Sequence, residues 1–471
     1  MSDLADTVRD TSAAYDMLPA GGIVLVLVSG GADSTGLLRL LMSGDIGTGF
    51  AIHVLHVNHL LRGADSECDE EFVRRLCETL KVPFHAVRYD VAAFARDNGL
   101  NLEDAGRQVR YRLAEETLDS LCAVAGVPPE RGRIAVAHTL DDRIETLLMR
   151  LAQGTGATGL VSLRPVRDRI VRPLADAARD DVRDYLRALG QEWREDASNL
   201  DTTRVRARVR HELLPVLRDI NPQVDQAIAR TLALLTDEDA LLATMGAAFA
   251  RDFSHVSPGE VAFDRAMMAT LSRPMRRRAI RAALASAFPE ASRIEFEHVE
   301  ALVDGLSSAS FARDLPDGLR AQSEYGRMIV LRSGEGSPAL APSLLPIPGN
   351  LDLAGVGSLI AEEVDPSDTT GTPDSVVVDA GAAEAFVVDR PRDGDRMRPL
   401  GLGGTKKLQD LLVDAKVPQR FRQTTPVVRD GESVVWVAGV RMAEEYRITG
   451  ATIRAVRLTW ERGGGDAAEA G

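Results

Sequence analysis

One short segment combines the glycines, hydroxyls and carboxylate of a phosphate-binding loop. It lies between an apolar run at residues 23–28 and an amphipathic stretch at residues 34–42. The loop consists of Ser29, Gly30, Gly31, Ala32, Asp33 and Ser34. Glycines let the backbone approach a phosphate, and a helix N-terminus beyond them offers unpaired N–H groups. We therefore expect the loop to bind phosphates, with Asp33 serving a Mg²⁺ ion. No lysine ends the loop as in a Walker A motif, which disfavours ordinary γ-phosphoryl transfer.

A second group of candidates stands where a short strand at residues 134–137 meets a predicted helix over 142–152. It contains His138, Asp142 and Glu145. The two carboxylates are three residues apart and so share one helical face. They would suit a metal ion on bound phosphates. Asp142 could instead only cap the helix N-terminus, where a carboxylate also complements the dipole.

Arg107 and Arg110 are likewise three residues apart, on a long predicted helix over 103–125. Guanidinium groups in a site can stabilise phosphate charge or bind a carboxylate. The alternative is that both side chains extend along the surface into solvent.

The elements that must position these residues alternate between apolar runs and amphipathic stretches from residue 21 to about 190. Such alternation is typical of βαβ units and predicts an α/β fold with a doubly wound parallel sheet. The predicted organisation is a catalytic domain over 1–215, a helical middle domain without strands over 216–332, a linker or irregular entry over 333–375, a small α+β C-terminal domain over 376–462 and a disordered tail over 463–471.

Charge is distributed unevenly along the 471 residues. The net charge is −14, yet residues 390–462 carry 15 basic and 9 acidic side chains. Binding to nucleic acid needs clustered cations rather than a favourable total. The clusters that we expect to contact a polyanion contain Arg206, Arg208, Arg210, Arg396, Lys406 and Lys407. We expect a helix over 406–414 that begins with the two lysines.

The cysteines and the apolar runs limit the classes of protein to which the chain could belong. Three cysteines without a CxxC pair provide neither a disulfide framework nor a Cys-rich metal site, which is typical of a reducing cytoplasm. The longest aliphatic run, residues 23–28, is far shorter than a membrane span, so we expect no membrane partner.

The loop resembles the SGGxDS signature of the PP-loop ATP pyrophosphatases, which have a Rossmann-like fold. An ordered series of further motifs resembles the bacterial tRNA(Ile)-lysidine synthetase family over about residues 22–450. The series is HVNHLLR (56–62), GRQVRYRL (106–113), AHTLDDRIET (137–146), GTGATGL (154–160), RPL (172–174), Asn199, RARVR (206–210), LP (214–215), RDGDR (392–396), GGTKKL (403–408), VP (417–418) and WVAG (436–439). The resemblance implies that ATP adenylates the C2 oxygen of the wobble cytidine in a CAU anticodon of tRNA(Ile). Free L-lysine then displaces AMP, which changes codon reading from AUG to AUA.

Residue roles follow from the same resemblance. ATP would contact residues 29–34 together with His56 and His138. Asp33, Asp142, Arg107 and Arg110 would be catalytic, with Asp33 and Asp142 near Mg²⁺. Asp142 and Glu145 would bind lysine, and the cationic clusters would bind tRNA. A homodimer is a further expectation. The alternatives are a PP-loop tRNA thiolase, which would need a nucleophilic cysteine, and a non-catalytic, nucleotide-gated RNA-binding protein.

Overall fold

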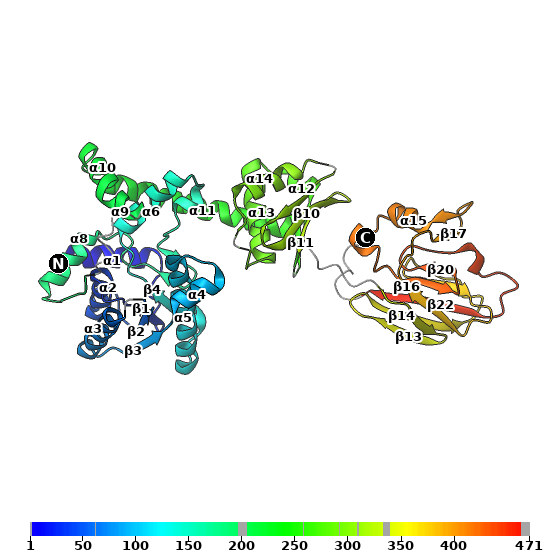
Figure 1. The fold of residues 1–471 in the computed structure, drawn as a ribbon, viewed down its shortest axis with the longest axis horizontal. Coiled ribbons are helices and arrows are strands. Elements are labelled where there is room, and N and C mark those ends of the chain that lie inside the picture. Colours follow the sequence, from blue (N-terminus) through cyan, green and yellow to red (C-terminus); the bar gives the residue numbers. More distant parts are fainter. Residues whose placement is uncertain are drawn as a thin grey trace. The chain divides into compact units, whose positions relative to one another are not determined.

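The computed structural model describes residues 2–61, 63–195, 205–257, 259–291, 293–308, 310–332 and 340–462 (Figure 1). It divides into two compact units, Met1–Leu241 and Leu242–Gly471. The predicted disordered tail over 463–471 and the motif residue Asn199 lie outside the described residues.

A six-stranded sheet with the order β3-β2-β1-β4-β6-β5 organises the first unit. Its strands are β1 (Ile23–Leu27), β2 (Ala51–Asn58), β3 (Phe84–Arg88), β4 (Gly132–Ala135), β5 (Val166–Arg167) and β6 (Ile170–Val171). All neighbours are parallel except β5 and β6. The order reverses between β1 and β4, and ligands of α/β sheets bind beyond the carboxyl ends of strands at such a point.

Helices cover both faces of this sheet because β1 is apolar along its whole length. Val24 and Val26 pack into a core with α2 and α3, whereas Leu25 and Leu27 pack against α5 on the opposite face. This arrangement confirms the doubly wound parallel sheet. The helices of the unit are α1 (Ser2–Ala14), α2 (Ala32–Ser43), α3 (Ala64–Leu80), α4 (Val91–Asn98), α5 (Leu102–Ala125), α6 (Leu140–Gln153), α7 (Ala157–Leu160), α8 (Arg179–Ala188), α9 (Val205–Arg208) and α10 (Leu214–Ile220). A π-helical turn, η3 (Val209–Leu213), joins α9 to α10.

Helix α11 (Val224–Phe253) is 30 residues long and continues past Leu241, where the first unit ends. Beyond it lie the further helices α12 (Arg265–Thr270), α13 (Arg273–Ala287) and α14 (Phe296–Gly305).

The middle region also contains a five-stranded antiparallel sheet, although the sequence predicted no strands there. The sheet has the order β7-β8-β11-β10-β9. Its strands are β7 (Ser254–Ser257), β8 (Glu260–Asp264), β9 (Ala312–Leu315), β10 (Leu319–Glu324) and β11 (Arg327–Arg332). Strands β9 and β10 are largely polar, whereas β8 and β11 carry short buried apolar runs at residues 261–263 and 328–330.

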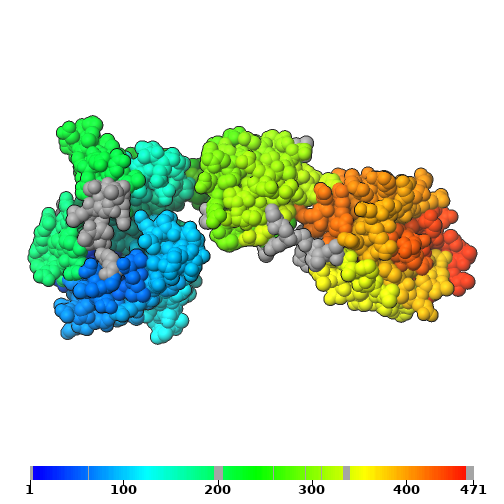
Figure 2. Space-filling model, in the orientation of Figure 1, coloured from blue at the N-terminus to red at the C-terminus, as the bar shows by residue number. Residues whose placement is uncertain are grey.

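Two antiparallel sheets share one core in the C-terminal region, which Figure 2 shows in yellow to red. The first contains β12 (Ser343–Pro346), β16 (Ala385–Asp389), β19 (Val427–Asp430), β20 (Ser433–Val437) and β21 (Arg441–Met442). The second contains β13 (Gly349–Leu353), β14 (Gly357–Val364), β15 (Ser375–Asp379) and β22 (Ala455–Arg462). The sequence predicted a linker or an irregular entry over 333–375, and for the described part the linker interpretation was wrong. Its Pro and Gly residues form tight turns between three strands rather than a linker.

Candidate active site

The loop between β1 and α2 has the local geometry of an anion cradle. Gly30 has a positive φ of 94°, which only glycine adopts without strain. Gly31 is the N-cap residue of α2, so the first N–H groups of that helix follow the loop. The Ser34 hydroxyl donates to the Gly31 carbonyl at 3.1 Å and accepts from the Ser29 N–H at 3.2 Å. These bonds fix the loop in shape.

The two predicted histidines lie near the ends of strands that flank β1. His56 is buried on β2 and its Nδ1 is 2.8 Å from the Val28 carbonyl oxygen. His138 follows β4, and Arg172 Nε donates to its Nδ1 at 3.0 Å. Burial, together with the nearby Arg172 charge, lowers the pKa of His138 to about 3. His138 is therefore a neutral group at physiological pH, with Nδ1 as an acceptor.

Asp142 has both a structural and an electrostatic position. Thr139 is the N-cap residue of α6, and its backbone N–H and hydroxyl donate to Asp142 Oδ2 at 2.8 and 3.2 Å. This capping box fixes the carboxylate so that Oδ1 points the other way. Oδ1 accepts from Arg179 and from Arg206, each at 2.7 Å. Both roles expected for Asp142 are therefore filled by one side chain: Oδ2 caps the helix, and Oδ1 faces the site.

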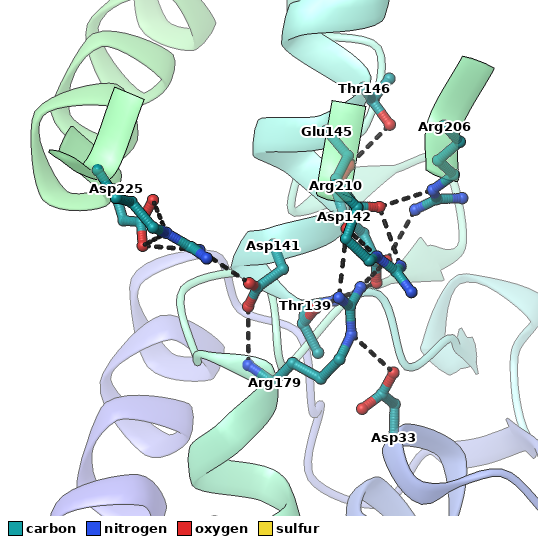
Figure 3. A network of polar contacts seen from close by, with 11 residues as sticks. Asp33, Thr139, Asp141, Asp142, Glu145, Thr146, Arg179, Arg206, Arg210 and Asp225 are labelled. Atoms are coloured by element: carbon teal, nitrogen blue, oxygen red, sulfur yellow. Dashed lines mark hydrogen bonds and ion pairs between the residues drawn. The ribbon is translucent and has the colours of Figure 1, made fainter. Parts of the chain in front are cut away.

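Glu145 is fully buried and is surrounded by three guanidinium groups (Figure 3). Arg179 donates to Oε1 at 3.2 Å, Arg206 donates to Oε2 at 2.7 Å, and Arg210 donates to both oxygens at 2.7 and 3.2 Å. Burial would raise the pKa of Glu145, but the hydrogen bonds and charges of these arginines outweigh it and lower the pKa. Glu145 is therefore ionised at neutral pH.

Asp33 faces this acidic pair across Arg179 (Figure 3), whose Nε is 3.7 Å from Asp33 Oδ2. Burial and repulsion from Asp142 raise the pKa of Asp33 to about 6, although Arg179 opposes the shift. Among the described residues, Asp33 Oδ1 has no hydrogen-bond partner despite its burial. A carboxylate oxygen of this kind fits a cation. Mg²⁺ in nucleotide sites often takes only one or two carboxylates and completes its shell with phosphates and water.

The two predicted arginines of α5 differ in exposure and in what they lie near. Arg110 is half-buried, and its charge contributes to the lowered pKa of His138. Arg107 is exposed and stacks on the Tyr111 ring with its guanidinium carbon 5.6 Å from the ring centroid. Arg107 and Arg172 also line a cavity of about 390 Å³. Because Arg172 contacts His138, this cavity adjoins the site.

The clustered arginines after residue 204 take two different positions. Arg206 and Arg210, four residues apart, both contact Glu145, although the sequence suggested a role in polyanion binding for both. Arg208 lies between them, is exposed and pairs with Glu212 at 3.2 Å. Helical spacing explains the split, because residues i and i+4 share a face that residue i+2 does not.

Arg179 is the site residue that the sequence analysis missed. It occupies the first position of α8, where a cation opposes the helix dipole. That unfavourable placement, ahead of Asp180 and Asp181, is the signal that could have identified it.

In the C-terminal region, the predicted helix start at Lys406 was wrong. Helix α15 (Leu408–Asp414) begins two residues later, and β18 (Lys406–Lys407) pairs with β17 (Arg396–Met397). The glycine-rich turn before Lys406 favours a hairpin, which the helix-like apolar spacing after it concealed. Arg396 lies directly opposite Lys407, and like charges in that position destabilise a strand pair. Lys406 forms an ion pair with Asp414.

Two other kinds of site are absent from the described ranges. No group of three or more His, Cys, Asp or Glu side chains there could hold a metal ion by itself. None of the helices described is both long enough and apolar enough to cross a bilayer.

Comparison with known proteins agrees with this geometry. Residues 8–217 match a PP-loop domain, and residues 386–460 match the TilS substrate C-terminal domain. The chain is 37% identical over 467 residues to the tRNA(Ile)-lysidine synthase of Geobacter sulfurreducens, covering 97% of this chain and 96% of that relative. It is 34% identical over 481 residues to the tRNA(Ile)-lysidine synthase of Symbiobacterium thermophilum, covering 98% of each. A crystal structure of a TILS C-terminal domain is 31% identical, with a TM-score of 0.23, over 26% of this chain and 98% of that one.

The parallel sheet and the loop over residues 29–34 define a PP-loop protein, a class that uses ATP. Its similarity to full-length relatives is more specific: the chain belongs to the tRNA(Ile)-lysidine synthase family. The resemblance and the fold class expected from the sequence are thereby confirmed, and tRNA is the macromolecular substrate that the family implies.

Proposed function

We propose that this chain ligates L-lysine to C2 of the wobble cytidine in a CAU anticodon of tRNA(Ile), at the expense of ATP. The observation that carries the proposal is the buried pair Asp142 and Glu145 facing a PP-loop that holds Asp33. The same proposal includes a cytoplasmic location. It also includes a homodimer, and light scattering on the purified chain would test this oligomeric state.

The first step would be adenylation of the tRNA. The C2 oxygen attacks the α-phosphorus of ATP, the bond to the β-phosphate breaks, and pyrophosphate leaves. The backbone N–H groups at the start of α2 would hold the phosphates, and Arg110 would stabilise the charge that develops on the α-phosphate. Mg²⁺ bound through Asp33 would neutralise phosphate charge.

The second step would join lysine to the activated base. The ε-ammonium group would give one proton to Asp142 or Glu145, and the resulting amine attacks C2. The bond from C2 to the AMP oxygen breaks, AMP leaves, and the nitrogen of the new C–N bond loses a second proton to water. Activation is needed because an amide-like oxygen is a poor leaving group until it carries AMP. Asp142 Oδ1 and Glu145 would bind the ε-ammonium group before attack, since buried carboxylates hold a cation strongly when water is excluded.

The thiolase alternative receives little support from the cysteines. Cys77 and Cys122 are buried, and burial raises the pKa of Cys77 to about 12. A thiol of that kind is not a nucleophile at neutral pH, which leaves Cys68 on α3 as the one exposed cysteine of the three.

A product assay tests the proposal. The chain is incubated with ATP, labelled L-lysine and bulk tRNA, and the nucleosides of the recovered tRNA are analysed. We expect a lysine-modified cytidine together with AMP and pyrophosphate, all dependent on tRNA. Formation of ADP and orthophosphate, or of a sulfur-modified nucleoside, would contradict it. Glu145→Gln serves as the negative control.

A further inference from the structure

Every carboxylate oxygen proposed to bind lysine already has a partner from the chain itself. Glu145 Oε1 accepts from Arg179 and Arg210, and Oε2 accepts from Arg206 and Arg210. Asp142 Oδ1 accepts from Arg179 and Arg206, while its Oδ2 is committed to the α6 cap. A lysine ammonium group therefore has no free acceptor on these two side chains in this conformation (Figure 3).

The three guanidinium groups are not equivalent. The Arg179 side chain is 12% exposed and also approaches Asp33, so it belongs to the interior of the site. The Arg206 and Arg210 side chains are 39% and 29% exposed, and both come from the α9–η3 segment, residues 205–213. A polyanion in solvent can reach these two without entering the site.

The net charge of the cluster also indicates that an arginine must leave before lysine can bind. The cluster contains three carboxylates, Asp33, Asp142 and Glu145, and three guanidinium groups. An added ammonium group would give an excess of positive charge unless an arginine leaves. Free lysine competes poorly, since the arginines are tethered beside the carboxylates and bind them through several N–H groups. Phosphates offer guanidinium groups an alternative partner of equal quality.

We propose that Arg206 and Arg210 plug the lysine-binding carboxylates until tRNA phosphates draw them away, so that productive lysine binding follows tRNA binding. This inference rests on the proposed function. The two arginines thus serve two ligands in turn: Glu145 in the free enzyme and the tRNA backbone in the complex. Their departure also removes two of the influences that lower the pKa of Glu145, and burial then makes it a stronger acceptor for an ammonium proton.

Lysine affinity with and without tRNA tests the plug. Equilibrium dialysis with labelled L-lysine would use the full chain, and Arg206→Gln/Arg210→Gln would be compared with the unmodified protein. We expect lysine to bind the double variant at least tenfold more tightly in the absence of tRNA, and tRNA to add less than twofold. Arg210→Gln alone leaves Glu145 with Arg179 and Arg206, so it should fold and show a smaller gain in the same direction.

Two matched variants separate the plug from general charge effects. Arg208→Gln removes a cation from the same segment whose ion-pair partner is Glu212 rather than Glu145, so tRNA affinity should fall while lysine affinity stays within twofold. Arg150→Gln removes an exposed cation from α6 itself and should also leave lysine affinity within twofold.

The possible failures are distinguishable. If the arginine variants bind lysine no more tightly than the unmodified protein, while Glu145→Gln abolishes lysine binding in the presence of tRNA, the plug is wrong and the lysine pocket stands. If lysine does not bind the unmodified protein even with tRNA and ATP, the proposed function fails, and the plug fails with it.

Discussion

The acidic cluster at the start of α6 and the β17–β18 hairpin differ in whether the partners of their cationic side chains are buried or exposed. In the cluster, arginines lie against Glu145, which is fully buried. In the hairpin, the exposed Arg396 and Lys407 face each other across a strand pair, and Lys406 pairs only with an exposed aspartate. Buried pairs are weakly screened by salt, whereas exposed cations respond to it strongly. The comparison shows that a run of basic residues in a sequence does not reveal whether the side chains bind buried carboxylates or face solvent. The burial of their partners decides between the two.

The largest expected effect tests the chemistry of the buried region. Asp142→Asn should lower turnover roughly a hundredfold or more, because a charge contact to the reacting amine is lost, and should keep tRNA affinity within a few-fold. Single-turnover kinetics and filter binding measure the two quantities. Asp141→Asn is the matched control, since Asp141 accepts from the backbone N–H of Arg179 rather than from its guanidinium group. Its turnover should fall less than tenfold. Normal turnover by Asp142→Asn would remove Asp142 from the mechanism.

A second prediction concerns the effect of the buried Asp33 charge on the free energy of unfolding. Folding raises the pKa of Asp33 from 3.8 to about 6, so at pH values above 6 the ionised carboxylate destabilises the native state relative to the unfolded chain. Asp33→Asn should therefore stabilise the free protein by roughly 3 kcal/mol at pH 8. The gain should shrink as the pH falls through 6 and vanish below about 3.8, where Asp33 is protonated in both states. Calorimetric unfolding across this range measures it. Equal stabilisation at pH 3.5 and pH 8 would show that ionisation is not the cause.

The third prediction tests the exposed region. Each phosphate contact contributes a slope of somewhat under one to log affinity against log salt. Lys406→Ala/Lys407→Ala should weaken tRNA binding and flatten this slope by about one to two units, without loss of ATP binding. Stability should change little, because both side chains lie at or near the surface. Filter binding over a salt series is the measurement, and an unchanged slope would mean that the hairpin does not hold tRNA through these lysines.

The smallest effect is expected from a cationic cluster that is already paired. Arg273 and Arg277 on α13 both bind Glu300, and the Arg277 hydrogen bond helps lower the pKa of Glu300 to about 2. Arg277→Ala should therefore change the salt slope of tRNA binding by less than about half a unit. A larger change, measured in the same salt series, would move the tRNA interface towards α13 and weaken the contrast between paired and exposed cations.

Contiguous features could be predicted from the sequence, and features that depend on tertiary neighbours could not. The PP-loop and the pair Asp142 and Glu145 are fixed by strand, turn and helix signals within a few residues, so their placement followed from local chemistry. Arg179 contacts carboxylates more than thirty residues away along the chain, so its unfavourable place at the start of α8 can mark the residue as unusual but cannot identify its partners. Arg206 and Arg208 look alike in sequence and differ only in what their helix faces.

The same distinction explains the errors in the fold. In the middle sheet, β9 was missed because it buries only one side chain, Leu315. Strands β8 and β11 were missed because a short apolar run is as compatible with a buried helical turn as with a strand. The strands β12 to β14 were taken for a linker, since prolines and glycines crowd their turns. In both cases the pairing partners, rather than the residues of the strand, decide the conformation.

The capping box at Thr139 has an evolutionary consequence. Because Asp142 ties one oxygen to the first turn of α6 and presents the other to the site, helix stability and ligand contact depend on a single side chain. A glutamate there would keep the charge but lengthen the arm by one carbon, so the cap and the contact could no longer both be satisfied by the same geometry. Selection at this position therefore acts on the stability of α6 and on the ligand contact together.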